Sequence, residues 1–398
     1  MGEQPSSIED RPATQTRWLA VGRSTRAGAR DAGREAAAEA LRGGEDPRLV
    51  LVFCSEAYDL PALLAGIREH AAGVPLIGCS TAGEIAADGP RDHSVVVTVL
   101  GGAGFRVCTR AAIAREQRLR EAGADVARAA REIAGCEHRV LMLLTDGLAG
   151  DQQEFVRGAY GVVGAEVPLV GGCAGDSLKM VRTFQLHDDR ILTGAVVAAA
   201  IGSDAPLGIG VRHGCRRTGA PMVVTRASGS RIEQIDDEPA LDVYLDRLGA
   251  PADARSDPGA FTRFALMHPL GLARRRGEGF VRFVNAPGYD DRSLGGYVPQ
   301  GAVAWFMTGD EDSALAATDA ACADALRALG DRPPLGLIAF DCISRRMVLR
   351  EGIEPEIQRV AASAAGAPVA GFYTYGEIAR TRGLSGFHNH TLVILAVS

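Results

Sequence analysis

The sequence has little or none of several features that mark common classes of protein. Lysine occurs once among 43 basic residues, at Lys179, and Met180 follows it. A phosphate-binding P-loop needs a lysine followed by serine or threonine, so this class of ATPase is excluded. Acidic residues outnumber basic ones, 49 to 43, and no dense basic run is present. Because a basic patch supplies most of the affinity for nucleic acid, we expect no nucleic-acid partner.

Long apolar stretches are also missing. The longest one, from about residue 191 to residue 201, is too short to span a bilayer. Residues 1–16 are polar and acidic and contain no apolar segment of the kind found in signal peptides. We therefore expect a disordered tail over residues 1–16 and a cytoplasmic protein that does not insert into membranes.

The eight cysteines are widely spaced, and none forms a Cys-x-x-Cys pair. Zinc knuckles and thioredoxin-type redox sites need that close spacing to bring two thiols together, so both lose support. We expect most of the cysteines to be reduced and buried as small apolar residues.

What the sequence does contain is a repeated pattern. Residues 74–85, 167–178 and 367–378 share a proline, an apolar pair and a glycine, followed by a second glycine and an acid. An apolar run and an amphipathic stretch precede each copy, and a β-branched run follows it, so each unit reads as strand, helix, strand, loop, strand. A fourth unit near residue 267 is either degenerate or absent.

These units predict an α/β fold with mixed sheets flanked by helices. A chain of 398 residues with 46% apolar residues is long enough for two such domains. The polar stretch from residue 249 to 259, which contains proline and glycine, is the expected boundary. We therefore predict one domain over residues 17–250 and a second over residues 251–398.

The repeated loops are the main candidates for a ligand site. Glycines there can leave backbone N–H groups facing a small molecule, and the acids can accept a hydrogen bond from its ammonium or hydroxyl group. The alternative is that the glycines form tight turns and the acids cap backbone N–H groups. Two further candidates, Asp146 and the pair Cys342 and Arg345, follow buried strands, where α/β sheets place ligand contacts. The candidate ligand-binding residues are Gly78, Cys79, Ser80, Thr81, Gly83, Glu84, Asp146, Gly172, Cys173, Asp176, Cys342, Arg345, Tyr373, Thr374 and Glu377.

Three histidines stand in surroundings that would suit a metal or haem ligand: His268, His388 and His390. The alternative for each is a structural histidine with satisfied hydrogen bonds.

The motifs, taken in order, resemble a known family. Residues 52–59, 77–85, 145–147 and 171–176 are similar to the FIST N domain, and residues 342–345, 371–378 and 388–391 are similar to the FIST C domain that follows it. The resemblance covers nearly all of the chain from Trp18 onward.

This resemblance implies a bacterial sensory module that binds a small ligand such as an amino acid or a derivative. It also implies a signalling partner, such as a histidine kinase or a cyclic-nucleotide enzyme, on which the module would act in trans. Some family members resemble haem-binding nitric-oxide sensors that regulate a kinase, which makes haem a possible cofactor here. An enzyme that uses Cys79, Cys173 or Cys342 as its nucleophile is a third alternative, and the oligomeric state stays open.

Overall fold

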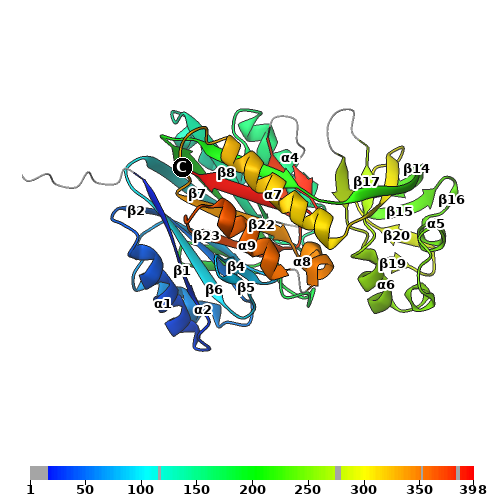
Figure 1. Cartoon of the computed structure of the whole chain (residues 1–398), viewed down its shortest axis with the longest axis horizontal. Coiled ribbons are helices and arrows are strands. Elements are labelled where there is room, and N and C mark those ends of the chain that lie inside the picture. The colour runs from blue at the N-terminus through cyan, green and yellow to red at the C-terminus, as the bar shows by residue number, and fades with distance from the viewer. Residues whose placement is uncertain (1–16, 115–117, 274–278, 351–352, 382–385) are drawn as a thin grey trace, which may run out of the picture.

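The structure is a computed structural model that describes residues 17–114, 118–273, 279–350, 353–381 and 386–398. The predicted tail, residues 1–16, lies outside the described residues. The expected α/β class with mixed sheets is confirmed: three six-stranded mixed sheets form a body, and a fourth, wholly antiparallel sheet forms a smaller lobe at one end of the molecule (Figure 1). Within the described residues, no helix combines the length and the hydropathy that crossing a membrane requires.

The three body sheets have the same order of strands. In each, the second and third strands along the chain are parallel, and the last strand is antiparallel to the second and to the first. The first sheet contains β1 (Trp18–Ser24), β2 (Pro47–Cys54), β3 (Leu76–Ser80) and β6 (Val95–Gly101). The second contains β7 (Phe105–Ile113), β8 (His138–Thr145), β9 (Leu169–Cys173) and β12 (Ala195–Ser203). The third contains β13 (Leu207–Arg212), β22 (Gly336–Cys342), β23 (Val369–Thr374) and β26 (Leu392–Val397).

A short pair of strands from a neighbouring segment completes each sheet. The pair β4 (Glu84–Ala86) and β5 (Gly89–Arg91) adds to β23 of the third sheet, not to β3 that precedes it. In the same way β10 (Gln185–His187) and β11 (Arg190–Leu192) add to β3, and β24 (Glu377–Arg380) and β25 (Phe387–His388) add to β9. The three sheets are therefore linked in a closed ring by exchanged pairs of strands.

Helices cover the outer face of each body sheet, and the inner faces share one core. On β2, for example, Val50 and Val52 pack against the helices while Leu51 and Phe53 face the common core. Because both of their faces are buried, inner strands such as β2, β12 and β26 are continuous apolar runs without polar alternation. The rings of Phe53, Phe340 and Phe372, from the first and third sheets, meet with centroids 4.7 to 6.3 Å apart. The body helices are α1 (Ala29–Leu41), α2 (Leu60–Arg68), α3 (Leu119–Ala127), α4 (Gln152–Val163), α7 (Glu311–Arg327), α8 (Ile343–Leu349) and α9 (Ile353–Ser363).

The lobe is inserted between β13 and α7 of the third sheet's segment and has its own apolar core. Its sheet is antiparallel throughout, so the fourth repeated unit considered near residue 267 is not formed. The predicted boundary at residues 249–259 falls inside the lobe, from just after α5 (Ala240–Arg247) to the first residues of α6 (Pro258–Ala265). The lobe consists of β14 (Arg216–Ser228), β15 (Arg231–Ile235), β16 (Glu238–Pro239), α5 (Ala240–Arg247), α6 (Pro258–Ala265), β17 (Leu270–Leu272), β18 (Phe280–Arg282), β19 (Pro287–Gly288), β20 (Ser293–Gly295) and β21 (Val303–Thr308).

Candidate functional site

The three repeated loops, which follow β3, β9 and β23, meet at the centre of the body. Backbone hydrogen bonds join them: the Gly175 N–H donates to Ser80 O at 3.0 Å, the Ala82 N–H to Tyr373 O at 2.9 Å, and the Cys173 N–H to Gly376 O at 2.8 Å. A Cβ at Gly175 would lie 2.9 Å from the Ala82 nitrogen, which is too close for any side chain. The glycines therefore permit close packing of loop on loop.

Two of the loops form the same turn around a buried acid. The Thr81 hydroxyl donates to Glu84, whose other oxygen accepts from the Ser94 N–H at 3.1 Å. In the third loop Thr374 donates to Glu377 in the same way, and the Thr391 N–H donates to Glu377 at 3.2 Å. Burial raises the pKa of Glu84 to about 7 and that of Glu377 to about 8. Each carboxyl group thus connects its own loop to the residue that precedes the last strand of its sheet, β6 for Glu84 and β26 for Glu377.

The acid of the middle loop, Asp176, makes a different set of hydrogen bonds. The Asp176 carboxylate accepts from the N–H groups of Met180, Val181 and Arg182 at 2.7 to 2.9 Å, and from the Tyr375 hydroxyl. These contacts fix the following loop, in which Met180 has a positive φ of 54°. The acids of all three loops accept hydrogen bonds from their own protein, as in the capping alternative. That these loops also bind a ligand stays a prediction.

The candidate cysteine nucleophiles are buried in the body. Burial raises the pKa of the Cys79, Cys173 and Cys342 thiols far above the ordinary range. Cys173 donates to the Gln152 side chain at 3.4 Å, and Cys342 lies 2.9 Å from the Ser344 hydroxyl. A nucleophilic cysteine needs an accessible thiolate, so this environment gives the third alternative no support.

Arg345, in the first turn of α8, is bound entirely by the protein's own groups and connects several elements. Its guanidinium donates to the buried carboxylates of Asp341 and Glu356. It also donates to the His213 carbonyl at 3.2 Å, where the chain leaves for the lobe, and to the Ala314 carbonyl at 3.1 Å, just after the chain returns. Arg345 therefore fixes both chain connections of the lobe to the interior of the body.

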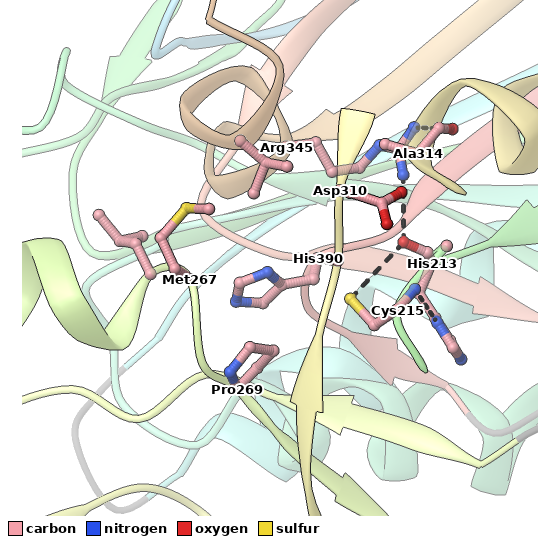
Figure 2. A pocket seen from close by; sticks show the side chains of 12 residues that line it. His213, Cys215, Met267, Pro269, Asp310, Ala314, Arg345 and His390 are labelled. Atoms are coloured by element: carbon pink, nitrogen blue, oxygen red, sulfur yellow. Dashed lines mark hydrogen bonds between the residues drawn. The ribbon is translucent and has the colours of Figure 1, made fainter. Parts of the chain in front are cut away.

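A small pocket lies between lobe and body beside Arg345; we call it the His390 pocket. Its cavity volume is about 10 Å³, room for about one water molecule. Figure 2 shows the His390 imidazole pointing into the pocket, with Met267 and Pro269 on one side and Cys215 on the other. Nε2 of His390 has no hydrogen-bond partner among the described residues, although the side chain is only 2% exposed. The lining residues are His213, Gly214, Cys215, Leu266, Met267, Pro269, Gly309, Asp310, Ala314, Arg345, Val348 and His390.

A larger, open cleft adjoins the second sheet; we call it the Asp146 cleft. It has a volume of about 580 Å³, and Tyr297 of the lobe forms part of its wall. Asp146 follows β8, and its carboxylate accepts from the Thr183 hydroxyl at 2.7 Å. Asp151 caps α4 by accepting from the Gln153 N–H at 3.0 Å. The lining residues are Ala114, Leu119, Arg120, Asp146, Leu148, Ala149, Gly150, Asp151, Glu154, Gly194 and Tyr297.

The candidate haem ligands do not fit a haem group in this structure. Nδ1 of His268 lies 2.8 Å from the Phe264 carbonyl, and its ring stacks on Phe264. Nε2 of His388 lies 3.0 Å from the Ala379 carbonyl. His390 has an unpartnered nitrogen, but lobe and body enclose it from opposite sides and leave no room for a porphyrin. Within the described part of the chain, no three His, Cys, Asp or Glu side chains are grouped to hold a metal ion.

The structure thus separates the candidate residues into two groups. Asp146 and Arg345 line hollows at the junction of lobe and body. The rest lie in or beside the central loops, namely Gly78, Cys79, Ser80, Thr81, Gly83, Glu84, Gly172, Cys173, Asp176, Cys342, Tyr373, Thr374 and Glu377. Glu84 also borders a separate shallow groove. Sequence reasoning missed Cys215 and Met267, which line the His390 pocket, and Tyr297, which lines the Asp146 cleft. None of them belongs to a repeated motif, and each reaches its hollow only because the lobe folds onto the body.

Comparisons with known proteins agree with the sequence motifs. The model of the FIST N domain matches residues 48–238, and the model of the FIST C domain matches residues 240–380. Two proteins of Mycobacterium tuberculosis, "Uncharacterized protein MT0656" and "Uncharacterized protein Rv0628c", are each 24% identical over 94% of this chain and 97% of their own length. "Uncharacterized protein MJ1623" of Methanocaldococcus jannaschii is 25% identical over 56% of this chain, and the match spans only 46% of that relative.

Proposed function

Because the chain belongs to the FIST domain family, whose domains are associated with sensory signal transduction and small-ligand binding, we propose that it senses an amine-bearing small ligand and acts in trans on a signalling protein. The partner would be of the kind named above, a histidine kinase or a cyclic-nucleotide enzyme. The ligand would bind in the Asp146 cleft and change how the lobe sits on the body.

One observation carries the proposal: residues from both parts of the molecule line the Asp146 cleft. The body contributes the loop after β8 and the start of α4, and the lobe contributes Tyr297. The Tyr297 hydroxyl lies so near the loop that a Cβ on Gly150 would be 3.4 Å from it. A ligand held here would touch lobe and body together, and its binding energy would favour one arrangement of the two.

The charges of the cleft favour a cationic group. Its lining contains the carboxylates of Asp146, Asp151 and Glu154 but a single arginine, Arg120. Arg120 donates to both oxygens of Glu154, at 2.7 and 3.2 Å, so this pair is balanced internally. Asp146 and Asp151 remain without a lining countercharge, and an ammonium group would provide it. An amino acid or a derivative carries such a group.

The experiment is a calorimetric titration of the full chain with a panel of L-amino acids and their amides. We expect at least one to bind, and Asp146→Asn, which keeps the shape but removes the charge, to weaken it about tenfold. Asp189→Asn, at an exposed position, is the matched control and should leave binding unchanged. Failure of every amine in the panel would contradict the proposed ligand class.

Small-angle scattering and hydrogen exchange then test the mechanism. The bound ligand should alter the scattering curve and slow or speed exchange in the lobe strands β14 and β21. A ligand that binds in the cleft without either effect would contradict a signal carried by the lobe.

A further inference from the structure

We propose that the outer face of the lobe sheet is a docking surface for an acidic segment of a partner protein. Four side chains define this surface, which we call the Trp305 face: Arg217, Val223, Val303 and Trp305. In taking the partner to be a signalling protein, the proposal rests on the function proposed above, but the docking itself needs no amine ligand.

The register of two strands brings these four side chains onto one face. Along β21, Val303 and Trp305 alternate with residues that belong to the core of the lobe. On β14, Val223 lies directly opposite Val303, and Arg217 lies opposite Met307, two residues beyond Trp305. The helices α5 and α6 pack on the other face of the sheet, in the core of the lobe. The Trp305 face therefore points away from that core.

The apolar part of the face is open to solvent. Val223 and Val303 are each 40% exposed. Because directly opposite residues on antiparallel strands have their side chains in contact, the two valines form one apolar patch next to Trp305. Single exposed apolar side chains are common, but adjoining ones on one face indicate an interaction site.

Arg217 supplies the charge of the face. Its guanidinium carbon lies 4.0 Å from the centre of the Trp305 ring, which is a cation–π contact. Among the residues that the structure describes, no carboxylate pairs with Arg217, whereas its neighbour Arg216 pairs with Asp310. Stacking on the ring holds the guanidinium in position, and its N–H groups can still donate to a carboxylate in the plane of the group.

This combination favours one kind of occupant. Tryptophan and arginine are among the residues that contribute most to binding at the centres of protein interfaces. A partner segment with an apolar side chain over the two valines and a carboxylate against Arg217 would match both parts of the face. A second copy of this chain matches less well, because a symmetric dimer brings like faces together and would oppose two unpaired guanidinium groups.

The test selects peptides on the full chain. The Trp18→Phe variant, which leaves Trp305 as the single tryptophan, is immobilised, and a displayed library of random linear peptides is panned on it. We expect enrichment of peptides that combine Asp or Glu with an aromatic or aliphatic residue. Each selected peptide is then titrated in solution, and its binding should change the Trp305 fluorescence in a saturable way.

Substitutions place the selected peptides on the face. Arg217→Glu should weaken their binding about tenfold, and peptides whose acids are changed to lysine should regain affinity for this variant. Val303→Asp leaves Arg217 in place but puts a carboxylate in the apolar patch, so it should weaken the same peptides independently. Arg263→Glu, at an exposed position of α6 on the opposite side of the lobe sheet, makes the same charge change and is the matched control.

The other outcomes contradict the proposal. Peptides without acids, or with equal affinity for Arg217→Glu and the parent, would show that Arg217 does not select the partner. If panning enriches no peptide that depends on the Trp305 face, the face is not a docking surface. Sedimentation of the chain alone at rising concentration tests the second copy: self-association that Val303→Asp abolishes would assign the face to a dimer.

The experiment is independent of the amine titration. Asp146→Asn should leave peptide binding intact, because Asp146 lies in the cleft and not on the Trp305 face. Failure of the amines alone would contradict the proposed ligand, and failure of the peptides alone would contradict this docking surface.

Discussion

Replacing Arg345 by methionine should destabilise the protein more than any surface change of the same chemical kind. The variant removes the guanidinium that donates to two carboxylates, Asp341 and Glu356, which are fully buried. It also removes the donors to the Ala314 carbonyl at 3.1 Å and the Thr318 hydroxyl at 2.9 Å. Breaking a buried ion pair from one side typically costs about 3–5 kcal/mol because a charge is left without a partner.

The adjacent residue supplies a matched control. Arg346 pairs with Asp92 at 2.7 and 2.9 Å, but the Asp92 side chain is 55% exposed. Partly exposed ion pairs contribute about 1 kcal/mol or less, so Arg346→Met should cost far less than Arg345→Met. In the double variant Arg345→Met with Glu356→Gln, part of the lost stability should return because one buried charge is gone.

Denaturant unfolding followed by tryptophan fluorescence measures the effect in each part of the molecule. The chain has two tryptophans, Trp18 on β1 of the body and Trp305 on β21 of the lobe. Changing either one to phenylalanine leaves a reporter for the other part. We expect Arg345→Met to lower the midpoint in both, since Arg345 holds the connections of the lobe. Equal losses for Arg345→Met and Arg346→Met would refute the reasoning.

Three further predictions concern the core of the body. Burial raises the pKa of Glu84 to about 7 and that of Glu377 to about 8, so the folded protein binds more protons than the unfolded chain between pH 6.5 and pH 8. The free energy of unfolding should therefore fall by about 2 kcal/mol over this interval. In urea titrations, Glu377→Gln should make this pH dependence less steep. A rise in stability over this interval would contradict it. Gly175→Ala should cost about 1–3 kcal/mol in thermal or chemical unfolding because its Cβ would lie 2.9 Å from the Ala82 nitrogen, whereas Gly161→Ala, with nothing within 4 Å, should be neutral or stabilising. Phe340→Ala, where two sheets meet, should cost about 3–5 kcal/mol, and a loss below 1 kcal/mol would mean that the shared core is not as described.

The strands were predictable because burial on both faces leaves a strong local signal. Apolar runs such as residues 140–144 and 49–53 are strands whose two faces meet helices on one side and the common core on the other. The repeated segments 74–85, 167–178 and 367–378 likewise mark equivalent ends of third strands.

Other features could not be read from the sequence, for physical reasons. The exchange of the β4 and β5 pair depends on β23, which is distant in the chain, and local residue preferences carry no information about that partner. Nε2 of His390 has no hydrogen-bond partner among the described residues because of the side chains that the lobe places opposite it, and the sequence does not show which side chains these are. The repeated loops were identified as candidates from their glycines and acids. Only the packing shows that backbone hydrogen bonds join the loops and that the acids accept hydrogen bonds from the protein itself.

The ring of exchanged strand pairs has a consequence for how the chain is made. Glu84–Arg91 leaves the ribosome early, yet its partner β23 (Val369–Thr374) is synthesised far later. The first sheet, in turn, obtains its outer strands from residues 185–192 of the next segment. No segment can therefore complete its sheet during translation from its own residues alone. Final closure must wait for the third segment, and until then the nascent chain carries unpaired strand edges of the kind at which unfinished chains aggregate.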